Sequence, residues 1–213
     1  MKLAMRIAPI VLVSLLLLTS PARAALLLNV GGTADRPITF DSNEAIAVSF
    51  NLSAPFDDVS FSAPLICDSC TFTVFLMQAR LGPSATAGDL VQATSYTGIP
   101  LGGTLFSGVD LVADDYYVVV ANLGGPSIIW EGGASPSVFS VPEVSHLEDW
   151  ASSSFDVTFP PTSAFDVILD QGARFYTVEA AVTGAVAEPG SPLLLLGAGL
   201  LILIMRRGTG VAG

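Results

Sequence analysis

The residues best suited to chemistry in this sequence are its only two cysteines, Cys67 and Cys70, which form a Cys-x-x-Cys pair. Such a pair can be a redox site, half of a metal site or a structural disulfide. A thioredoxin-type pair opens a helix, whereas residues 71–75 are β-branched and aromatic and predict a strand. A zinc site needs two further ligands, and the chain offers only His146. In an oxidising compartment we therefore expect a local disulfide that fixes the entrance of a strand.

The sole histidine, His146, is the only residue that could serve as the base of a Ser-His-Asp or Cys-His site. It lies in the stretch EVSHLEDW, close in sequence to Glu143, Glu148 and Asp149, and the chain contains no Gly-x-Ser-x-Gly motif. We therefore interpret His146 as a surface histidine beside carboxylates. A carboxylate pair for glycoside hydrolysis stays open, since acidic residues are abundant, but nothing singles out two of them.

Acidic turns and two tryptophans are the remaining candidates for ligand binding. The acidic residues at 41–44, 57–58 and 114–115 fall at predicted loops, where they could supply oxygen ligands for calcium or simply favour the turns. No Asp-x-Asp-x-Asp-Gly loop is present, so no metal ligand is assigned. Trp130 follows two isoleucines and is expected in the core. Trp150 lies in a polar stretch and is the better candidate for an exposed platform on which a sugar stacks.

The elements that must position these residues are predicted to be short strands. Apolar and polar residues alternate at 46–52, 59–63 and 155–159, which predicts half-buried strands. The runs 71–77 and 116–123 are apolar on both faces and are expected at the centre of sheets. Further strands are expected at 26–30, 90–96, 127–130, 165–169 and 175–182. Residues 145–153 are the one stretch in which we expect a helical turn, and 83–90 is expected to be a loop.

About ten short strands separated by turn residues favour an all-β fold, an antiparallel two-sheet β-sandwich of jelly-roll-like or Greek-key topology. The charge of this body excludes one class of partner. Between Ala25 and Ala187 the chain carries 18 acidic residues against Arg36, Arg80 and Arg174, a net charge of −15. Such a surface repels phosphate backbones, so no nucleic-acid partner is expected.

The N-terminus has the organisation of a secretory signal peptide. Lys2 and Arg6 form a basic segment, residues 7–18 are apolar, and small residues lead up to Ala24. Cleavage is expected between Ala24 and Ala25, which implies export across the inner membrane. The residue directly after the cleavage site is Ala25 and not a cysteine, which argues against a lipoprotein.

The C-terminus combines four features in order: Glu188-Pro189, a small polar spacer, the apolar run 193–205, and Arg206-Arg207. A helix of 13 residues reaches only ~20 Å, against ~30 Å of hydrocarbon in a bilayer. The two arginines would stay cytoplasmic under the positive-inside rule and leave the body of the protein outside. A permanent membrane anchor is one interpretation of this tail, and a temporary stop is the other.

The order of features in the tail resembles the PEP-CTERM sorting domain of exported Gram-negative bacterial proteins. Glu188 and Pro189 match the second and third positions of the Pro-Glu-Pro motif, and Ala187 stands in place of the first proline. The resemblance is confined to the tail. It implies recognition by an exosortase, a membrane-embedded cysteine protease that cuts near the motif, and an association with extracellular polysaccharide.

The sequence thus predicts an exported, non-enzymatic β-sandwich protein of the cell surface or extracellular matrix, anchored in the membrane until an exosortase-type protease processes it. Its expected segments are a signal peptide (1–24), a β-sandwich domain (25–183), a linker with the sorting motif (184–192), and a hydrophobic sorting helix with a basic tail (193–213). The first alternative is a carbohydrate-binding module whose loops bind polysaccharide, with or without calcium. The second is a secreted hydrolase. No catalytic residue or cofactor is assigned.

Overall fold

The computed structural model describes residues 24–155, 163–168 and 171–181, and throughout these ranges the chain is built from antiparallel β-sheets. The all-β class expected from the strand pattern is therefore confirmed. Helical structure in the described residues is limited to short 3-10 turns, and none of their helices is long and apolar enough to cross a membrane. The predicted signal peptide up to residue 23 and the segments 184–192 and 193–213 lie outside the described residues.

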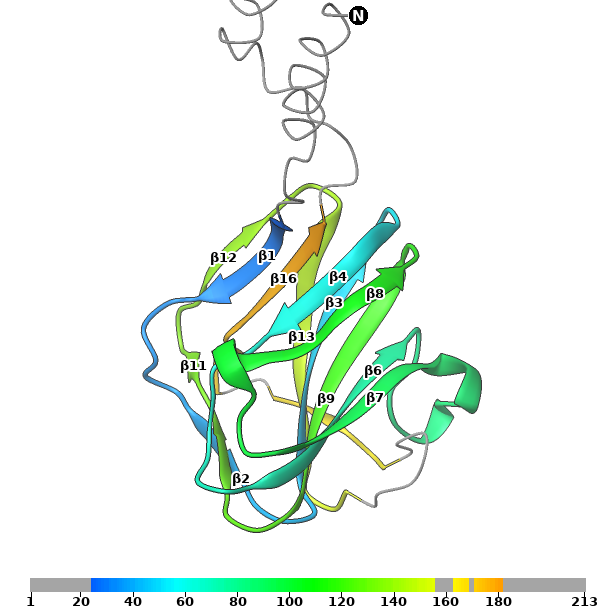
Figure 1. Cartoon of the computed structure of the whole chain (residues 1–213). Helices are drawn as coiled ribbons and strands as arrows, with labels where there is room; N and C mark the ends of the chain where they lie inside the picture. Colours follow the sequence, from blue (N-terminus) through cyan, green and yellow to red (C-terminus); the bar gives the residue numbers. More distant parts are fainter. Residues whose placement is uncertain (1–23, 156–162, 169–170, 182–213) are drawn as a thin grey trace, which may run out of the picture. The chain divides into compact units, whose positions relative to one another are not determined.

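One of the two larger sheets has five strands in the order β12-β1-β16-β4-β8 (Figure 1). Its members are β1 (Ala24–Gly31), β4 (Phe56–Ser62), β8 (Thr104–Leu111), β12 (Ser137–Ser140) and β16 (Tyr176–Ala181). The first described strand of the chain, β1, therefore pairs with the last, β16. This pairing is antiparallel and joins residues that are far apart in the sequence.

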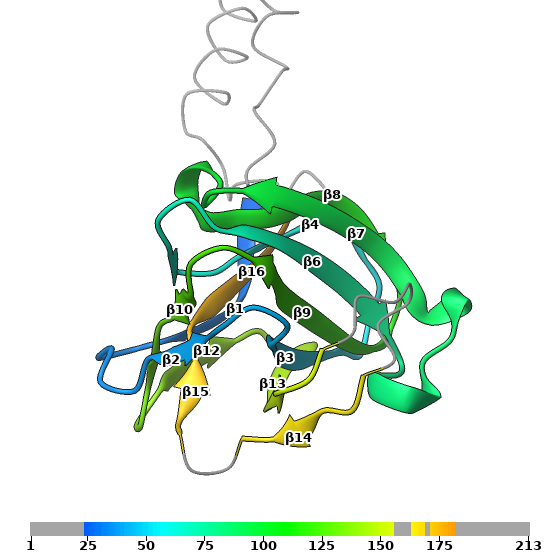
Figure 2. The ribbon, with the colours of Figure 1, turned by 90° about the horizontal axis from the view of Figure 1, so that it is seen from below.

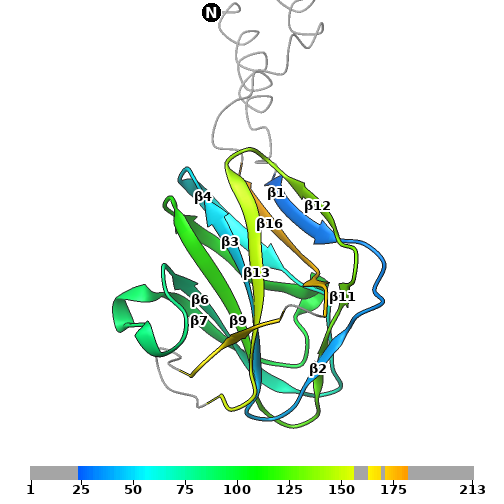
Figure 3. The same cartoon turned by 180° about the vertical axis from the view of Figure 1, so that it is seen from behind.

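The other larger sheet has six strands in the order β14-β13-β3-β9-β6-β7 (Figure 3). Its members are β3 (Ala45–Leu52), β6 (Thr71–Gln78), β7 (Leu90–Thr97), β9 (Asp114–Gly124), β13 (Val144–Ser152) and β14 (Asp166–Val167). The strands β6 and β9 lie inside this sheet, each between two neighbours. This agrees with the expectation from their runs of residues that are apolar on both faces.

Two small sheets and three 3-10 turns complete the described structure. One small sheet has the order β2-β10-β5, and the other pairs β11 with β15. Their bounds are β2 (Ile38–Phe40), β5 (Leu65–Ile66), β10 (Ile128–Trp130), β11 (Gly132–Gly133) and β15 (Ala173–Arg174). The turns are η2 (Gly82–Ser84), η3 (Ala87–Asp89) and η4 (Leu101–Gly103).

The two larger sheets share one hydrophobic core (Figure 2). Leu28 and Val178 of the five-stranded sheet and Val48 and Val120 of the six-stranded sheet are all fully buried in it. Each such side chain contributes about 1.5–3 kcal/mol through the apolar area it removes from water. Because side chains alternate along a strand, Asn29 on β1 and Thr177 and Glu179 on β16, which adjoin buried residues, are only half-buried. A register shift between Leu26 and Leu28 interrupts this alternation, so Leu27 is buried in the core beside Leu28.

The opposite face of the six-stranded sheet is also covered, which corrects one expectation. Ala47, Phe75, Val119 and Phe155 form a second buried cluster there. The strand at 46–52 is therefore not half-buried as its alternation indicated, since Ala47 and its neighbour Ser49 are both buried. Small side chains on that face allow the loop around Phe155 to pack closely. Of the strand expected at 155–159, only Phe155 lies among the described residues, and it is not part of a strand.

The helical turn expected at 145–153 is wrong, because this stretch forms β13. Its pairing with β3 runs through His146 opposite Phe50 and then shifts to Asp149 opposite Val48. Two residues are thus accommodated where the partner strand has one, so the period of two is interrupted. This β-bulge conceals the strand from an analysis of periodicity. The strands β8 and β12 were also not foreseen: β8 contains register shifts, and β12 is exposed along its whole length.

Candidate functional site

The predicted signal-cleavage residues Ala24 and Ala25 are the first described residues of β1. They pair with Ala181 and Ala180 at the end of β16. The point at which the predicted signal peptide ends therefore lies beside the last described residue before the predicted linker (Figure 1). The sorting residues expected in the tail, Glu188, Pro189, Arg206 and Arg207, lie outside the described residues.

Cys67 and Cys70 lie at disulfide-bonding distance, with their Cα atoms 5.9 Å apart. Ser69 between them adopts a left-handed conformation with φ of 63°, which closes the tight loop. Cys70 is fully buried and immediately precedes β6, and its carbonyl accepts a hydrogen bond from the N–H of Gly98 at 2.8 Å. The pair thus occupies the entrance of a strand, as expected, and neither sulfur is a free thiol.

His146 is half-buried and lines a surface pocket with Glu148 and Asp149, but its ring nitrogen contacts an interior residue. Its Nδ1 lies 2.8 Å from the hydroxyl of Tyr176, which also donates to the carbonyl of Ser49 at 3.3 Å. Burial lowers the pKa of His146 below its ordinary value because the charged imidazolium loses solvation. Tyr176 lies on β16 and Ser49 on β3, so this hydrogen-bonded group connects the two larger sheets. The imidazole therefore contacts a buried tyrosine and not a nucleophilic serine or cysteine.

A buried ion pair between Asp149 and Arg174 was missed by the sequence analysis. The Asp149 Oδ2 accepts the backbone N–H of Arg174 at 2.6 Å and lies 3.8 Å from its Nε. The guanidinium donates from Nη1 to the carbonyl of Trp130 at 3.1 Å and from Nη2 to that of Gln171 at 2.7 Å. Arg174 is fully buried despite its charge. Nothing in its sequence neighbourhood signals this partner, which lies 25 residues away.

The electrostatics of this pair are set by burial. Burial raises the pKa of Asp149 to about 7, against the opposing effects of the Arg174 N–H and charge. Burial likewise lowers the pKa of Arg174, which the charge of Asp149 partly offsets. Asp149 Oδ1 and Arg174 Nε have no hydrogen-bond partner among the described residues. The pair therefore links β13 to β15 without being fully hydrogen-bonded.

Three of the acidic residues considered as calcium ligands accept hydrogen bonds from neighbouring protein groups. Glu44 accepts the N–H of Asp41 at 2.7 Å. Asp114 accepts from Gln78 at 2.9 Å, and Asp115 from the Asn51 amide at 2.8 Å. Within the described ranges, no group of three or more His, Cys, Asp or Glu side chains is placed to hold a metal ion.

The two tryptophans differ as expected in burial, but Trp150 is not an exposed platform. Trp130 is fully buried and donates its Nε1–H to the carbonyl of Phe175 at 2.9 Å, which confirms the expectation of a core residue. Trp150 is half-buried, edge-on to Tyr117 with ring centroids 6.5 Å apart. These two rings line a small pocket of about 210 Å³ together with Phe165 and Arg80.

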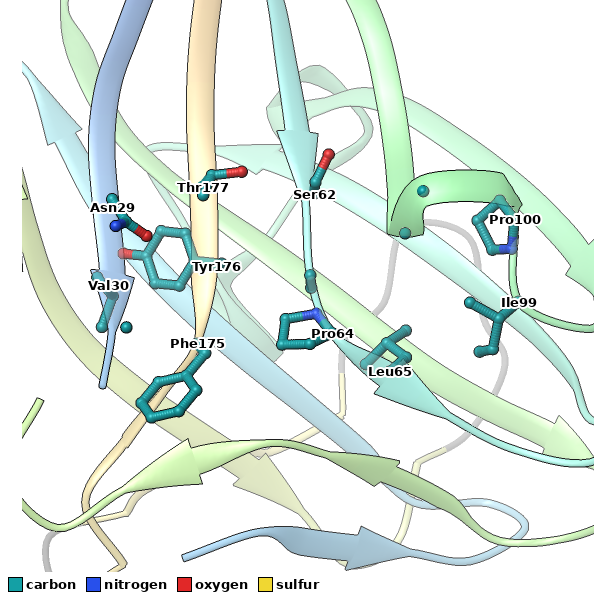
Figure 4. Close-up of a pocket in the computed structure, with 14 residues that line it drawn as sticks. Asn29, Val30, Ser62, Pro64, Leu65, Ile99, Pro100, Phe175, Tyr176 and Thr177 are labelled. Carbon is teal, nitrogen blue, oxygen red and sulfur yellow. The ribbon is translucent and has the colours of Figure 1, made fainter. Parts of the chain in front are cut away.

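A second and larger surface groove, of about 470 Å³, was not foreseen (Figure 4). It lies where β1, β16 and β4 meet the η4 turn before β8. Asn29, Thr177 and Ser62 stand in register on three neighbouring strands, and the hydroxyl of Ser62 lies 3.1 Å from that of Thr104 on the fourth. These four side chains form a row of amide and hydroxyl groups, which we call the polar row.

The rest of the groove is apolar and closely packed. Its walls are formed by Pro64, Leu65, Ile99 and Pro100 near Ser62, with Phe175 near the end of β1 (Figure 4). The η4 turn approaches β4 so closely that a Cβ on Gly103, which has φ of 71°, would lie 2.7 Å from the carbonyl oxygen of Ala63. None of the residues that line the groove is charged.

Comparison with known proteins gives no family assignment. No protein-family model matches the chain, and a search of curated proteins likewise found no match. Function must therefore be argued from the chemistry of the sites themselves.

Proposed function

We propose that this protein is an exported, non-enzymatic component of the cell surface or extracellular matrix, sorted through its PEP-CTERM-like tail. The observation that carries the proposal is that Cys67 and Cys70 lie at disulfide-bonding distance at the entrance of β6. Structural disulfides form and persist in oxidising compartments and are rare where thiols are kept reduced. The pair therefore supports export, in agreement with the signal-peptide pattern before Ala25.

The pairing of β1 with β16 supports the same proposal. Ala24 and Ala181 lie opposite one another, so the polypeptide leads to both of its predicted membrane-directed segments from one end of one sheet. A body attached in this way is held at a single point of its surface. Such an attachment suits a protein that is first held at a membrane by its C-terminal tail and then released or transferred by an exosortase-type protease.

We propose a jelly-roll-like β-sandwich as the finer description of the fold. The strands β1, β3, β4 and β6 alternate between the two larger sheets, and β8 and β9 alternate between them again. The last strand, β16, lies between β1 and β4. Connections that cross from sheet to sheet in this way are typical of Greek-key and jelly-roll topologies.

The non-enzymatic part of the proposal rests on the partners of the reactive residues. Both cysteines are engaged with one another, and His146 is engaged with a buried tyrosine. These contacts therefore do not favour a secreted hydrolase that uses a Ser-His-Asp or Cys-His site. A carbohydrate-binding module is the second candidate, favoured by the uncharged groove that is lined by three residues of the polar row, Asn29, Ser62 and Thr177.

Intact-mass spectrometry of the protein recovered from each cell fraction tests the proposal. We expect the released form to begin at Ala25 and to end near Glu188. Released protein that retains residues 193–205 would contradict the sorting role, and a protein confined to the reducing cytoplasm would contradict export.

A further inference from the structure

The polar row offers hydrogen bonds that the protein itself does not use. The side chains of Asn29 and Thr177 are half-buried and make no hydrogen bond to other described residues, whereas Ser62 and Thr104 bind each other. An amide both donates and accepts hydrogen bonds, and so does a hydroxyl. The row can therefore either donate hydrogen bonds to ligand hydroxyls or accept hydrogen bonds from them. Its groups stand on neighbouring strands, which lie about 4.8 Å apart.

Apolar groups lie directly beside this row. Pro64, Leu65, Ile99 and Pro100 form a wall near Ser62 (Figure 4). A ligand that fills the groove must therefore combine hydroxyl groups with exposed C–H surface. Pyranose rings have this combination, because their hydroxyls project from the rim and their ring faces carry C–H bonds. The volume of about 470 Å³ falls within the range of ligand-binding clefts.

The absence of charged side chains from the lining of the groove favours an uncharged ligand over a charged one. The body of the chain carries a net charge of −15 between 25 and 187, yet no acidic or basic side chain lines the groove. A uronate-containing polymer would find no cation there and would be repelled by the surrounding surface. An uncharged polymer would suffer no such repulsion and would lose no charge solvation on entering the groove.

We propose that this groove binds a segment of an uncharged polysaccharide, with Asn29 and Thr177 as its principal hydrogen-bonding residues. The proposal rests on the second candidate function and moves the ligand from the loops and Trp150 to the face of the five-stranded sheet. The groove lies at the opposite end of β1 and β16 from Ala24 and Ala181. It is therefore remote from the point at which the described chain leads to its predicted membrane-directed segments.

The test is affinity electrophoresis of the full-length chain in mild detergent, through gels that contain dextran, laminarin, barley β-glucan, galactomannan or alginate. We expect retardation by at least one of the four uncharged polymers and none by alginate. Asn29→Ala and Thr177→Val should each raise the dissociation constant about tenfold, the equivalent of one hydrogen bond to the ligand. Gly31→Leu should abolish retardation, because Gly31 lines the groove and its backbone conformation accepts a side chain.

The matched control is Ser107→Ala, at an exposed position of β8 that does not line the groove. It should bind like the wild type, and thermal unfolding should show that all variants are folded. Retardation by no uncharged polymer, equal retardation by alginate, or unchanged binding of the three groove variants would overturn the proposal. These outcomes are distinct from a failure of the sorting proposal, because the groove variants should be exported and processed like the wild type.

Discussion

Arg174 is fully buried, and its Nε lies 3.8 Å from Oδ2 of Asp149, which also accepts the Arg174 backbone N–H. Two charges taken out of water cost several kcal/mol each unless their mutual attraction and hydrogen bonds offset that cost. Here the offset is incomplete, since Asp149 Oδ1 and Arg174 Nε lack hydrogen-bond partners among the described residues. The pair is therefore the place where the stability of the fold should respond most directly to pH.

Asp149→Asn should remove a pH dependence of stability between about pH 4 and 7. Burial raises the pKa of Asp149 to about 7 in the folded state, from 3.8 as the ordinary value. The folded state therefore favours the protonated form of Asp149. The resulting contribution to the free energy of unfolding is fully present below about pH 4 and is lost as the pH rises to about 7. The loss is at most about 4 kcal/mol. Urea unfolding at several pH values measures this loss. If the free energy of unfolding of wild type and variant changed with pH in the same way, the prediction would be contradicted.

His146 should act in the opposite direction. Burial lowers its pKa, so the folded state disfavours the charged form. The stability that results is present above the ordinary pKa of 6.5 and is lost as the pH falls through that value toward the folded pKa. NMR titration of the single histidine should give a value below 6.5. A midpoint above 6.5 would show that the imidazole is solvated or paired with a carboxylate, as its sequence neighbours alone had suggested.

Tyr176→Phe should destabilise the fold by about 1–3 kcal/mol, because it leaves His146 Nδ1 and the Ser49 carbonyl without their common hydroxyl partner. The ring is kept, so its packing against Phe61 at a centroid distance of 5.2 Å should persist. Tyr96→Phe is the matched control, since the Tyr96 hydroxyl bonds a single carbonyl, that of Leu105. Chemical denaturation measures the unfolding free energy of both variants. If Tyr176→Phe lost less unfolding free energy than Tyr96→Phe, the proposed connection of the two sheets through Tyr176 would be refuted.

The double variant Cys67→Ser, Cys70→Ser should lose no more than about 2 kcal/mol of unfolding free energy. The bond closes a loop of only three residues in sequence separation, and the entropy that a disulfide removes from the unfolded chain grows with loop length. Native exported protein should not react with a maleimide. A much larger loss on substitution would mean that the pair also supports packing around the buried Cys70.

The elements that could be predicted from the sequence are those whose signal is local. The runs that form β6 and β9 are apolar on both faces over a whole strand. The disulfide between the two cysteines was predicted because a strand, and not a helix, follows them directly. The strand β13 could not be predicted, because a bulge after His146 interrupts its alternation. Its residue Asp149 shows the same limit, since its partner Arg174 is specified by the tertiary fold and by no motif.

The groove could not be predicted from the sequence for a related reason. Its lining comes from four separate stretches, 29–31, 62–65, 99–103 and 175–177, which only the sheet order brings together. Its residues are uncharged and belong to types that are ordinary at strand ends and turns. The search for chemistry instead favoured rare or reactive residues, such as His146 and Trp150, which the structure places in internal contacts.

The strongest test of the tail is the substitution Glu188→Ala. Glu188 and Pro189 are the only residues that match the Pro-Glu-Pro motif, so their loss should prevent recognition by the protease and leave the full-length form in the membrane fraction. The short run 193–205 is then held by Arg206 and Arg207, which favour the cytoplasmic side. Ala187→Pro, which restores the missing proline, is the matched control and should mature at least as fast as the wild type. In pulse-chase with membrane fractionation, wild-type maturation of the Glu188→Ala variant would leave the tail as a permanent anchor, because the Glu-Pro pair would then have no role in processing.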